Sequence, residues 1–409
     1  MARRYVVAGL VAAALAGAAA AAVRQADGGG PDPHTSRRIA PAPGSGAAAG
    51  RIFYPESDHV SAAEPTGRSL GPVTTQLFNR GPEQSAPAWP SPDRRWLLLV
   101  DGELIDLTAG KPVSPVQAVP PELVTVVENP GPQARLTAVA PWADHSRRVV
   151  LAAPYGRIRS VEVATGASTV LGRGQLPAGD PASNGAAYVV PAEGQAPTFG
   201  EQDFFVDYFA PVAAIARVAS GARPVTLATR AQLVAALGGS KVATVIASHL
   251  AFSADGSRLA VELALLDGTR RSGAVVVLDR SGGIVGVSAI PYAHGLTWLA
   301  WAPTGDRLAF GIPFARTLSI GLGGDNPPFL EAQLWRPGAG SARPVLAPAP
   351  GNRPLDTPCI WSPDGTQLLC GSELSWSFLD VSARRATVRE SVPGRPLAWV
   401  PAYAGSRHG

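Results

Sequence analysis

Two short apolar runs surround a polar turn in the stretch CIWSPDGTQLLCG, residues 359–371. Proline fixes φ at the value that a turn requires, aspartate can bond to its own backbone, and glycine tolerates a positive φ. Two apolar runs joined by such a turn are typical of a β-hairpin. The stretch therefore predicts two antiparallel strands at this point of the chain.

The same arrangement recurs along the sequence. Four further copies precede it: PAWPSPD at residues 87–93, AVAPWAD at 138–144, LAFSADG at 250–256 and LAWAPTG at 299–305. A third strand follows each hairpin: LIDLTAG at 104–110, SVEVATG at 160–166, AVVVLDRSGG at 274–283, LWRPGAG at 334–340 and FLDVSA at 378–383. Small sheets of this kind cannot bury both apolar faces alone, so they stack around an axis. The series predicts an all-β fold, a single β-propeller of four-stranded blades.

The number of blades follows from the spacing of the units. The gap between the turns at residues 144 and 255 is long enough for an additional unit, with YVVPAEG at 188–194 as its hairpin turn and IARVASG at 215–221 as its third strand. At the C-terminus, LAWVP at 397–401 looks like a first strand, and residues 51–54 or 74–78 could complete its sheet. We predict six blades, with a composite seventh as the alternative; ordinary hairpins of a β-sandwich are the competing interpretation.

The N-terminus has the features of an export signal. Arg3 and Arg4 precede an apolar stretch at residues 5–23, and small residues at 18–22 offer cleavage sites. The stretch is also long enough for an uncleaved membrane anchor. We predict a signal peptide or anchor at residues 1–24, a flexible linker at 25–50, a β-propeller at 51–401 and a tail at 402–409. The expected location is extracytoplasmic.

Charge and composition argue against a nucleic-acid partner. The formal net charge is only +4, from 35 Lys and Arg against 31 Asp and Glu. Lysine occurs only at Lys111 and Lys241, and no window combines basic with aromatic residues as a nucleic-acid groove does. The 45 glycines and 40 prolines require many turns, which suits short strands with tight connections.

No arrangement of residues predicts catalysis. GRSLG at residues 67–71 has the spelling of a nucleophile elbow, but that motif works only on a strand-to-helix turn. The histidines, His34, His59, His145, His249, His294 and His408, lie at no metal-ligand spacing. We therefore expect no catalytic residues, no metal and no cofactor. Asp325 and Asn326 beside glycines could hold calcium, although a turn is the more ordinary interpretation.

Cys359 and Cys370, the only two cysteines, flank the last hairpin. With a turn at residues 362–365, residue 359 lies opposite residue 368, so that Cys370 is diagonal to Cys359. A disulfide requires Cα atoms within about 7 Å, a distance that the diagonal offset could exceed. An even cysteine count at hairpin spacing in an exported chain nevertheless predicts a structural disulfide.

Two segments depart from regular blade length. PFARTLSIGLGGDNPPFLE at residues 313–331 is a long insertion between a second and a third strand, and TRAQLVAALGGSK at 229–241 predicts a short helix. Long loops on a rigid scaffold commonly carry binding. We predict that Arg316, Asp325, Asn326 and Phe329 contribute to a partner surface at one rim; neutral decoration is the alternative.

The turns at residues 91–93 and 362–365, with weaker forms at 253–256 and 302–305, resemble the WD-like repeats of the TolB family. As in those repeats, a tryptophan precedes three of the turns: Trp89, Trp301 and Trp361. The resemblance covers residues 86–400 and implies a bacterial envelope protein that binds other proteins through its end faces and axial funnel. TolB itself carries an additional N-terminal α/β domain, whereas Pro/Gly-rich residues lie between the leader and the first blade here, which is a departure from the family pattern.

These observations predict a non-catalytic, monomeric, exported scaffold that binds a protein or a cell-envelope component. Two alternatives stay open. One is a propeller enzyme of the hydrolase or lyase type that acts on a small or saccharide substrate at the axial funnel. The other is a sensor domain tethered to the membrane by an uncleaved N-terminal helix.

Overall fold

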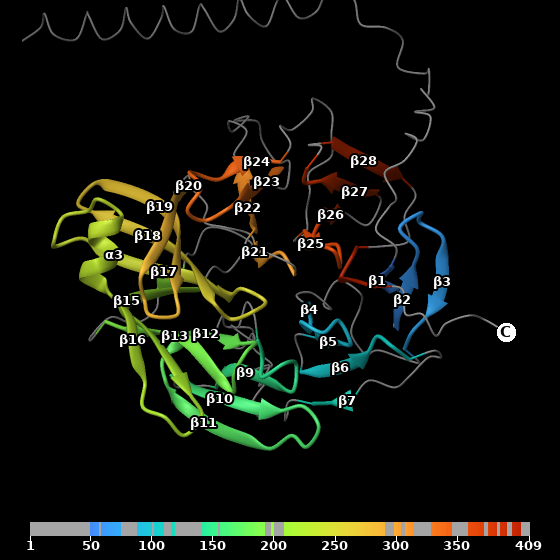
Figure 1. Ribbon diagram of the computed structural model, residues 1–409, viewed down its shortest axis with the longest axis horizontal. Helices are drawn as coiled ribbons and strands as arrows, with labels where there is room; N and C mark the ends of the chain where they lie inside the picture. Colours follow the sequence, from blue (N-terminus) through green and yellow to red (C-terminus); the bar gives the residue numbers. More distant parts are fainter. Residues whose placement is uncertain are drawn as a thin grey trace, which may run out of the picture. The chain divides into compact units, whose positions relative to one another are not determined.

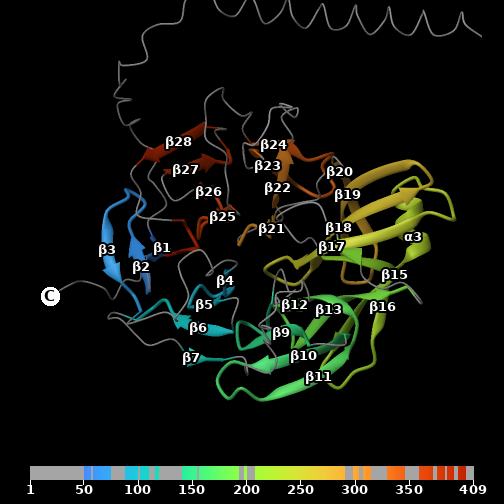
Figure 2. The same cartoon turned by 180° about the vertical axis from the view of Figure 1, so that it is seen from behind.

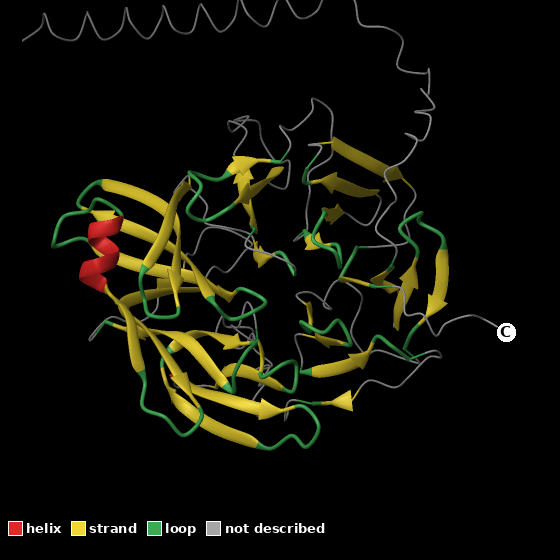
Figure 3. Cartoon of the chain, viewed as in Figure 1, coloured by secondary structure: helices red, strands yellow, loops and turns green. Residues whose placement is uncertain are grey.

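The computed structural model describes residues 50–56, 59–74, 88–99, 102–109, 116–118, 141–153, 156–192, 198–199, 208–290, 298–303, 307–314, 329–345, 359–371, 375–382, 385–390 and 395–401. The chain divides into two units, Met1–Gly46 and Ala47–Gly409, and every described residue lies in the second. Strands dominate this part, and one helix accompanies them (Figure 3). Among these residues no helix has the length and apolar character needed to cross a membrane.

Antiparallel strands form five four-stranded sheets and one nine-stranded sheet. We number the four-stranded sets in chain order. Set 1 contains β29 (Ala398–Val400), β1 (Arg51–Glu56), β2 (His59–Ala63) and β3 (Ser69–Pro72). Set 2 contains β4 (Ala88–Pro90), β5 (Trp96–Leu99), β6 (Glu103–Asp106) and β7 (Val116–Gln117). Set 3 contains β8 (Trp142–Ala143), β9 (Arg148–Ala153), β10 (Arg157–Glu162) and β11 (Ser168–Arg173).

The nine-stranded sheet contains two such sets. Set 4 contains β12 (Gln175–Asp180), β13 (Gly185–Pro191), β15 (Tyr208–Ala219) and β16 (Val225–Thr229). Set 5 contains β17 (Thr244–Phe252), β18 (Arg258–Asp267), β19 (Arg270–Asp279) and β20 (Ile284–Ile290). The start of β15 joins them, because Ala210 and Pro211 pair with Ala247 and Ile246. The short β14 (Thr198–Phe199) also pairs with β15.

The remaining two sets follow in chain order. Set 6 contains β21 (Trp298–Trp301), β22 (Leu308–Phe314), β23 (Phe329–Trp335) and β24 (Arg343–Pro344). Set 7 contains β25 (Ile360–Trp361), β26 (Gln367–Gly371), β27 (Ser375–Asp380) and β28 (Arg385–Glu390). The predicted third strands at residues 104–110, 160–166, 274–283, 334–340 and 378–383 each begin within the third strand of a set.

Each set packs its apolar face on the next, in a succession that closes on itself (Figures 1 and 2). One buried cluster joins each neighbouring pair, as shown from set 1 onward by Phe53 with Leu97, Leu98 with Val149, Val150 with Ala186, Val189 with Val261, Val275 with Phe310, and Ala309 with Leu368. The last cluster unites Leu369 of set 7 with Ile52 of set 1. Four-stranded antiparallel sheets stacked in a closed succession form a β-propeller, which confirms the predicted fold class.

Both ends of the described chain contribute to set 1. Strand β29 pairs with β1, with Val400 opposite Arg51 and Ala398 opposite Phe53. Of the two completions that the sequence offered for LAWVP, residues 51–54 are therefore the correct one. Pairing the two ends removes open sheet edges at that point. The strands form six sheets when they are grouped by hydrogen bonds, and seven sets when they are grouped by how they pack. The number of blades therefore stays a prediction.

Set 4 corrects one prediction and confirms two. The hairpin turn predicted at residues 188–194 is wrong, because β13 runs through Tyr188 and ends at Pro191. The turn lies earlier, at residues 181–184, where the sequence DPASNG offers turn residues in an order unlike the other copies. The third strand predicted at 215–221 is confirmed by β15, and the predicted helix by α3 (Arg230–Ala236), which Thr229 caps.

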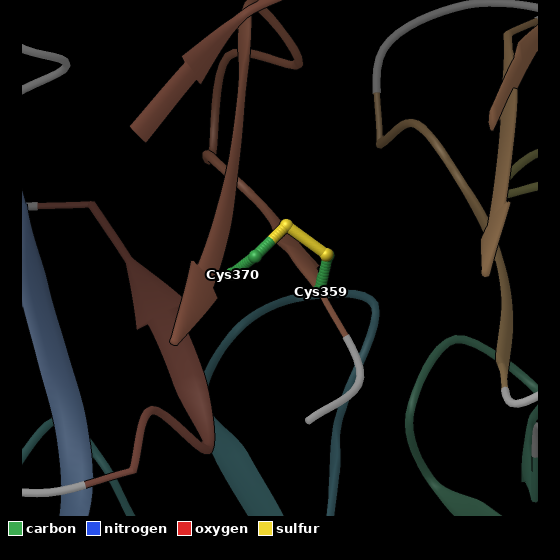
Figure 4. Close-up of a disulfide and its surroundings, with 2 residues drawn as sticks. All are labelled: Cys359 and Cys370. Atoms are coloured by element: carbon green, nitrogen blue, oxygen red, sulfur yellow. A yellow bond between two sulfur atoms is a disulfide. The ribbon is translucent and has the colours of Figure 1, made fainter. Parts of the chain in front are cut away.

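The predicted disulfide between Cys359 and Cys370 is present (Figure 4). Leu369 lies opposite Ile360 and Leu368 opposite Trp361, and Ser362 N donates to Gln367 O at 2.8 Å. The turn is thus longer than the sequence interpretation assumed. Continuing this register places Cys370 directly opposite Cys359 and not diagonal to it, with Cα atoms 4.2 Å apart.

Candidate functional site

The Ser-x-Asp pattern of the predicted turns is a local hydrogen-bonding unit. In the turn after β25, Ser362 Oγ donates to Asp364 Oδ1 at 2.6 Å, and Asp364 Oδ1 accepts Thr366 N at 3.0 Å. Ser362 Oγ also accepts Gln367 N at 2.9 Å. Ser91 with Asp93 and Ser253 with Asp255 repeat these three contacts. The aspartates therefore satisfy their own turns, as the sequence suggested.

These bonds change the acidity of the carboxyl groups. Burial raises the pKa of Asp255, but hydrogen bonds from Ser253 Oγ and from Ser257 N and Oγ outweigh burial, so that the pKa lies below its ordinary value. Asp364 has a lowered pKa for the same reason, through Ser362 and Thr366. Both carboxylates are consequently charged at neutral pH and accept hydrogen bonds from the backbone and side chains of their own turns.

The turn after β8 departs from this pattern. Ala143 stands where the turns at residues 91–93, 253–255 and 362–364 have serine, and Asp144, His145 and Ser146 take positive φ values of 51°, 52° and 70°. Three successive non-glycine residues in the left-handed region are rare, because their Cβ atoms crowd the following carbonyl. Such strain persists only where the surrounding structure imposes it, and it clusters at binding sites.

Neighbouring turns impose this conformation. Asp144 N donates to Asp180 O and to Ser183 O, both at 3.1 Å, and His145 N donates to Pro181 O at 2.8 Å. From the other side, Asp93 N donates to Ser146 Oγ at 3.2 Å. The turn at residues 144–147 is therefore bound to the turns of set 2 and set 4.

Asp180 extends the connection to set 5. Its fully buried carboxylate accepts Ala182 N at 3.0 Å, Ser183 Oγ at 2.7 Å and Arg217 Nη2 at 2.5 Å. Arg280 Nη2 lies 3.5 Å from it, and Arg280 Nε donates to Gly256 O at 3.0 Å. Gly256 is required here: its φ is +67°, and a Cβ would lie 2.5 Å from Asp180 Oδ1.

We name residues 91–95, 144–147, 181–184 and 253–257 the linked turns. Together they present exposed polar side chains: Asp93, Arg95, His145, Arg147 and Asp255. Two of the arginines form ion pairs, Arg147 with Asp144 and Arg95 with Asp106. The result is a rigid surface of alternating charge and hydrogen-bonding groups on four consecutive sets. Such a surface can recognise a polar partner without reorganising.

The residues predicted at the rim insertion are not tested by the described part of the chain. Arg316, Asp325 and Asn326 lie outside the described residues. Phe329 is the first residue of β23 and pairs with Phe314 across the strands. Their role as a partner surface stays a prediction. The linked turns were missed by sequence reasoning, although the turn ADHSR at residues 143–147 contains neither proline nor glycine, whereas each other copy contains at least one of them.

A second group that the sequence did not single out lies within set 5. A β-bulge places Ser248 and His249 of β17 opposite the single residue Glu262 of β18, and His249 Nδ1 contacts Glu262 Oε2. Glu262 is 3% exposed. Bulges commonly redirect a side chain and occur next to active sites, so this pair is a second candidate.

Other motifs that the sequence weighed have structural positions. Residues 69–71 of the GRSLG stretch lie in strand β3 (Ser69–Pro72), where Ser69 Oγ lies 3.2 Å from the Tyr54 hydroxyl, so the serine is on no strand-to-helix turn. Within the part of the chain that the structure describes, no group of three His, Cys, Asp or Glu could hold a metal ion.

No family model matches the chain, and no curated protein matches it. Solved structures do. Hydrazine synthase of Kuenenia stuttgartiensis is similar at a TM-score of 0.48 and 14% identity, over 79% of this chain and 89% of that one. AztD of Citrobacter koseri is similar at 0.47 and 12%, over 86% and 98%. TolB of Acinetobacter baumannii is similar at 0.38 and 12%, over 86% and 67%. These similar structures thus include TolB, whose repeats the turns resemble. At such low identities, the activity of none of these proteins can be assigned to this chain.

Proposed function

We propose that the chain is an exported binding scaffold that presents the linked turns to a protein or a cell-envelope component. The observation that carries this proposal is the left-handed conformation of Asp144, His145 and Ser146. Each such residue costs on the order of 1–3 kcal/mol, and the neighbouring sets maintain all three. That the neighbouring sets maintain His145 exposed in this costly conformation supports a role for its side chain in binding.

Export is supported by the disulfide and by the leader. Disulfides persist in oxidising compartments and are rare in the cytosol, and Cys359 is bridged to Cys370. The positive residues and apolar stretch at 1–24 match a secretory signal or an anchor. N-terminal sequencing of the mature protein distinguishes a cleaved signal from a membrane tether.

The partner surface is tested by crosslinking and affinity purification from an envelope fraction, followed by binding measurements with each purified candidate. The double variant His145→Ala/Arg147→Ala removes two exposed side chains of the linked turns and leaves their backbone bonds intact. Arg343→Ala, an exposed arginine of β24 in set 6, is the matched control.

The proposal expects a partner that binds the wild type and the control equally and the double variant at least about tenfold more weakly. A partner that binds all three equally contradicts it. If deletion of residues 320–329 alone abolishes binding, the rim insertion, and not the linked turns, is the contact surface.

The pair of His249 and Glu262 favours the second candidate function, a propeller enzyme acting on a small or saccharide substrate. A histidine oriented by a buried carboxylate is a common arrangement for proton transfer. Incubating the protein with panels of lactones and acidic and neutral oligosaccharides tests this function. Turnover that disappears in His249→Ala and survives in His145→Ala/Arg147→Ala would establish it over the scaffold.

A further inference from the structure

Two arginines lie directly opposite each other at the ends of β10 and β11. Arg157 pairs with Arg173, and both side chains are exposed. Residues in direct register across an antiparallel pair have Cβ atoms about 4.5–5.5 Å apart, and like charges there are destabilising. Negative charge bound beside this cross-strand pair of guanidinium groups would therefore be stabilising.

Arg159 belongs to the same group. Alternate residues of a strand point to one face, so Arg159 lies on the face of β10 that carries Arg157. The intervening Ile158 packs on the other face, in the cluster with Tyr188 of set 4. Val161, two residues beyond Arg159, packs against Leu98 of set 2. The three arginines thus share the face of set 3 that is directed toward set 2.

Carboxylates do not provide this negative charge among the described residues. Arg68, Arg95, Arg147, Arg217 and Arg280 each contact a carboxylate, but within the described part of the chain no such contact is seen for Arg157, Arg159 or Arg173. Arg159 Nη1 donates to Ser168 Oγ at 3.2 Å, and Arg159 Nε is buried with no hydrogen-bond partner among the residues that the structure describes. A buried donor without a partner is unusual in a native fold, and a water molecule, an ion or a ligand can complete it.

We propose that Arg157, Arg159 and Arg173 bind a phosphate group. The planar guanidinium fork matches the geometry of phosphate oxygens. A phosphate monoester carries about −1.5 to −2 charges at pH 7 and three acceptor oxygens, one for each arginine. A carboxylate supplies one charge and two oxygens and leaves the site with a larger positive excess. The site goes beyond the proposed scaffold function and is separate from the linked turns. Strand β9 lies between them, since Arg157 pairs with Ala153 at its far end.

The test uses the full, disulfide-intact chain in a phosphate-free buffer. Binding of inorganic phosphate and of glycerol 3-phosphate is measured by calorimetry, with acetate as the carboxylate arm. The variants are Arg157→Gln and Arg173→Gln. Arg223→Gln, at an exposed arginine in the turn between β15 and β16, is the matched control.

We expect saturable phosphate binding by the wild type and by the control, and binding at least about tenfold weaker by each variant. Acetate should bind more weakly than phosphate. Without phosphate, the thermal midpoint of both variants should equal or exceed that of the wild type, because a like-charge contact has been removed. Phosphate should raise the midpoint of the wild type and not that of the variants.

Three results would overturn the proposal: no phosphate binding by the wild type, equal binding by the variants, or a lower midpoint of the variants in phosphate-free buffer, which would assign the arginines a structural role. The source of the phosphate is decided by sedimentation with phosphatidylglycerol vesicles against phosphatidylcholine vesicles. Arg157-dependent sedimentation that inorganic phosphate competes away assigns a lipid headgroup. Its absence, with soluble phosphate still bound, assigns a soluble phosphate or ester.

Discussion

The indole Nε1 of Trp301 donates a hydrogen bond of 2.9 Å to the backbone carbonyl oxygen of Ala251. Trp301 lies on β21 and Ala251 on β17, which are the first strands of consecutive sets. The contact recurs from Trp361 to Ala300 at 3.0 Å and from Trp142 to Trp89 at 2.9 Å. Tryptophans before the turns thus join sets 3, 6 and 7 each to the set before it, in addition to filling the core.

Replacing Trp301 by phenylalanine should remove this bond and leave the Ala251 carbonyl buried without its donor. Trp298→Phe is the control, because Trp298 lies on the same strand, is also buried, and its Nε1 has no hydrogen-bond partner among the described residues. We expect Trp301→Phe to lower the free energy of unfolding in urea by about 1 kcal/mol more than Trp298→Phe does. Equal losses would mean that the bond adds no net stability.

Asp180→Ala should be among the more destabilising single changes in the molecule. It removes the carboxylate that Arg217 contacts and leaves that guanidinium partly buried without its counter-charge. Breaking a buried pair in this way costs about 3–5 kcal/mol. Asp144→Ala breaks the exposed pair with Arg147 and should cost less than about 1 kcal/mol. Denaturant titration of both variants measures the difference, and similar losses would contradict the assignment of Asp180 as the link between sets.

Acid should weaken the turns through Asp255 and Asp364. Hydrogen bonds hold the pKa of each carboxyl below the ordinary value in the folded state. The unfolded state therefore binds protons first as the pH falls. The contribution of these groups is fully present above the ordinary aspartate pKa of about 3.9 and is lost as the pH drops through the lower folded value.

The double variant Asp255→Asn/Asp364→Asn should accordingly be less stable than the wild type at pH 7, and its free energy of unfolding should fall less steeply below about pH 4. Thermal unfolding monitored by circular dichroism from neutral to acidic pH provides the measurement. Parallel pH profiles of the two proteins would show that these carboxyls do not contribute to acid sensitivity.

The disulfide should stabilise the last set by restricting the unfolded chain. Cys359 and Cys370 are separated by 11 positions, and closing a loop of this length is worth about 2–3 kcal/mol in the chain-entropy model. The variant Cys359→Ser/Cys370→Ser should lose that amount in a denaturant titration. Thiol titration of the denatured, unreduced wild type should find no thiol; two thiols would refute the bridge.

Sequence reasoning succeeded where structure is local. The turn at residues 362–365 and its copies carry their own hydrogen bonds through serine and aspartate, so their letters identify hairpins directly. It failed at residues 188–194, because the true turn of set 4 at 181–184 has a different sequence, in which Asp180 stands before the turn and accepts bonds from Ala182 N and Ser183 Oγ. The register predicted for the hairpin at residues 359–371 was also wrong, because the length of the turn depends on which backbone groups pair, and the residue types do not specify this.

The candidate site was less accessible to prediction than the fold. His145 was noted only as one of six scattered histidines, since nothing in its neighbours predicts a left-handed backbone. Its conformation depends on Asp180 and Pro181, which lie in a different set. The opposition of Arg157 and Arg173 likewise requires knowledge of the strand register.

By itself, the sequence determined that this chain folds into small antiparallel sheets that must stack to cover their apolar faces. It could do so because turns and apolar strands are each specified by residues that are adjacent in the chain. Only the tertiary structure decided which sheet follows which, how the two ends share set 1, and which side chains meet across sets. Those contacts join residues far apart in the chain, as Arg280 and Asp180 do. Their energies arise from burial and charge neutralisation that exist only after the sheets have packed.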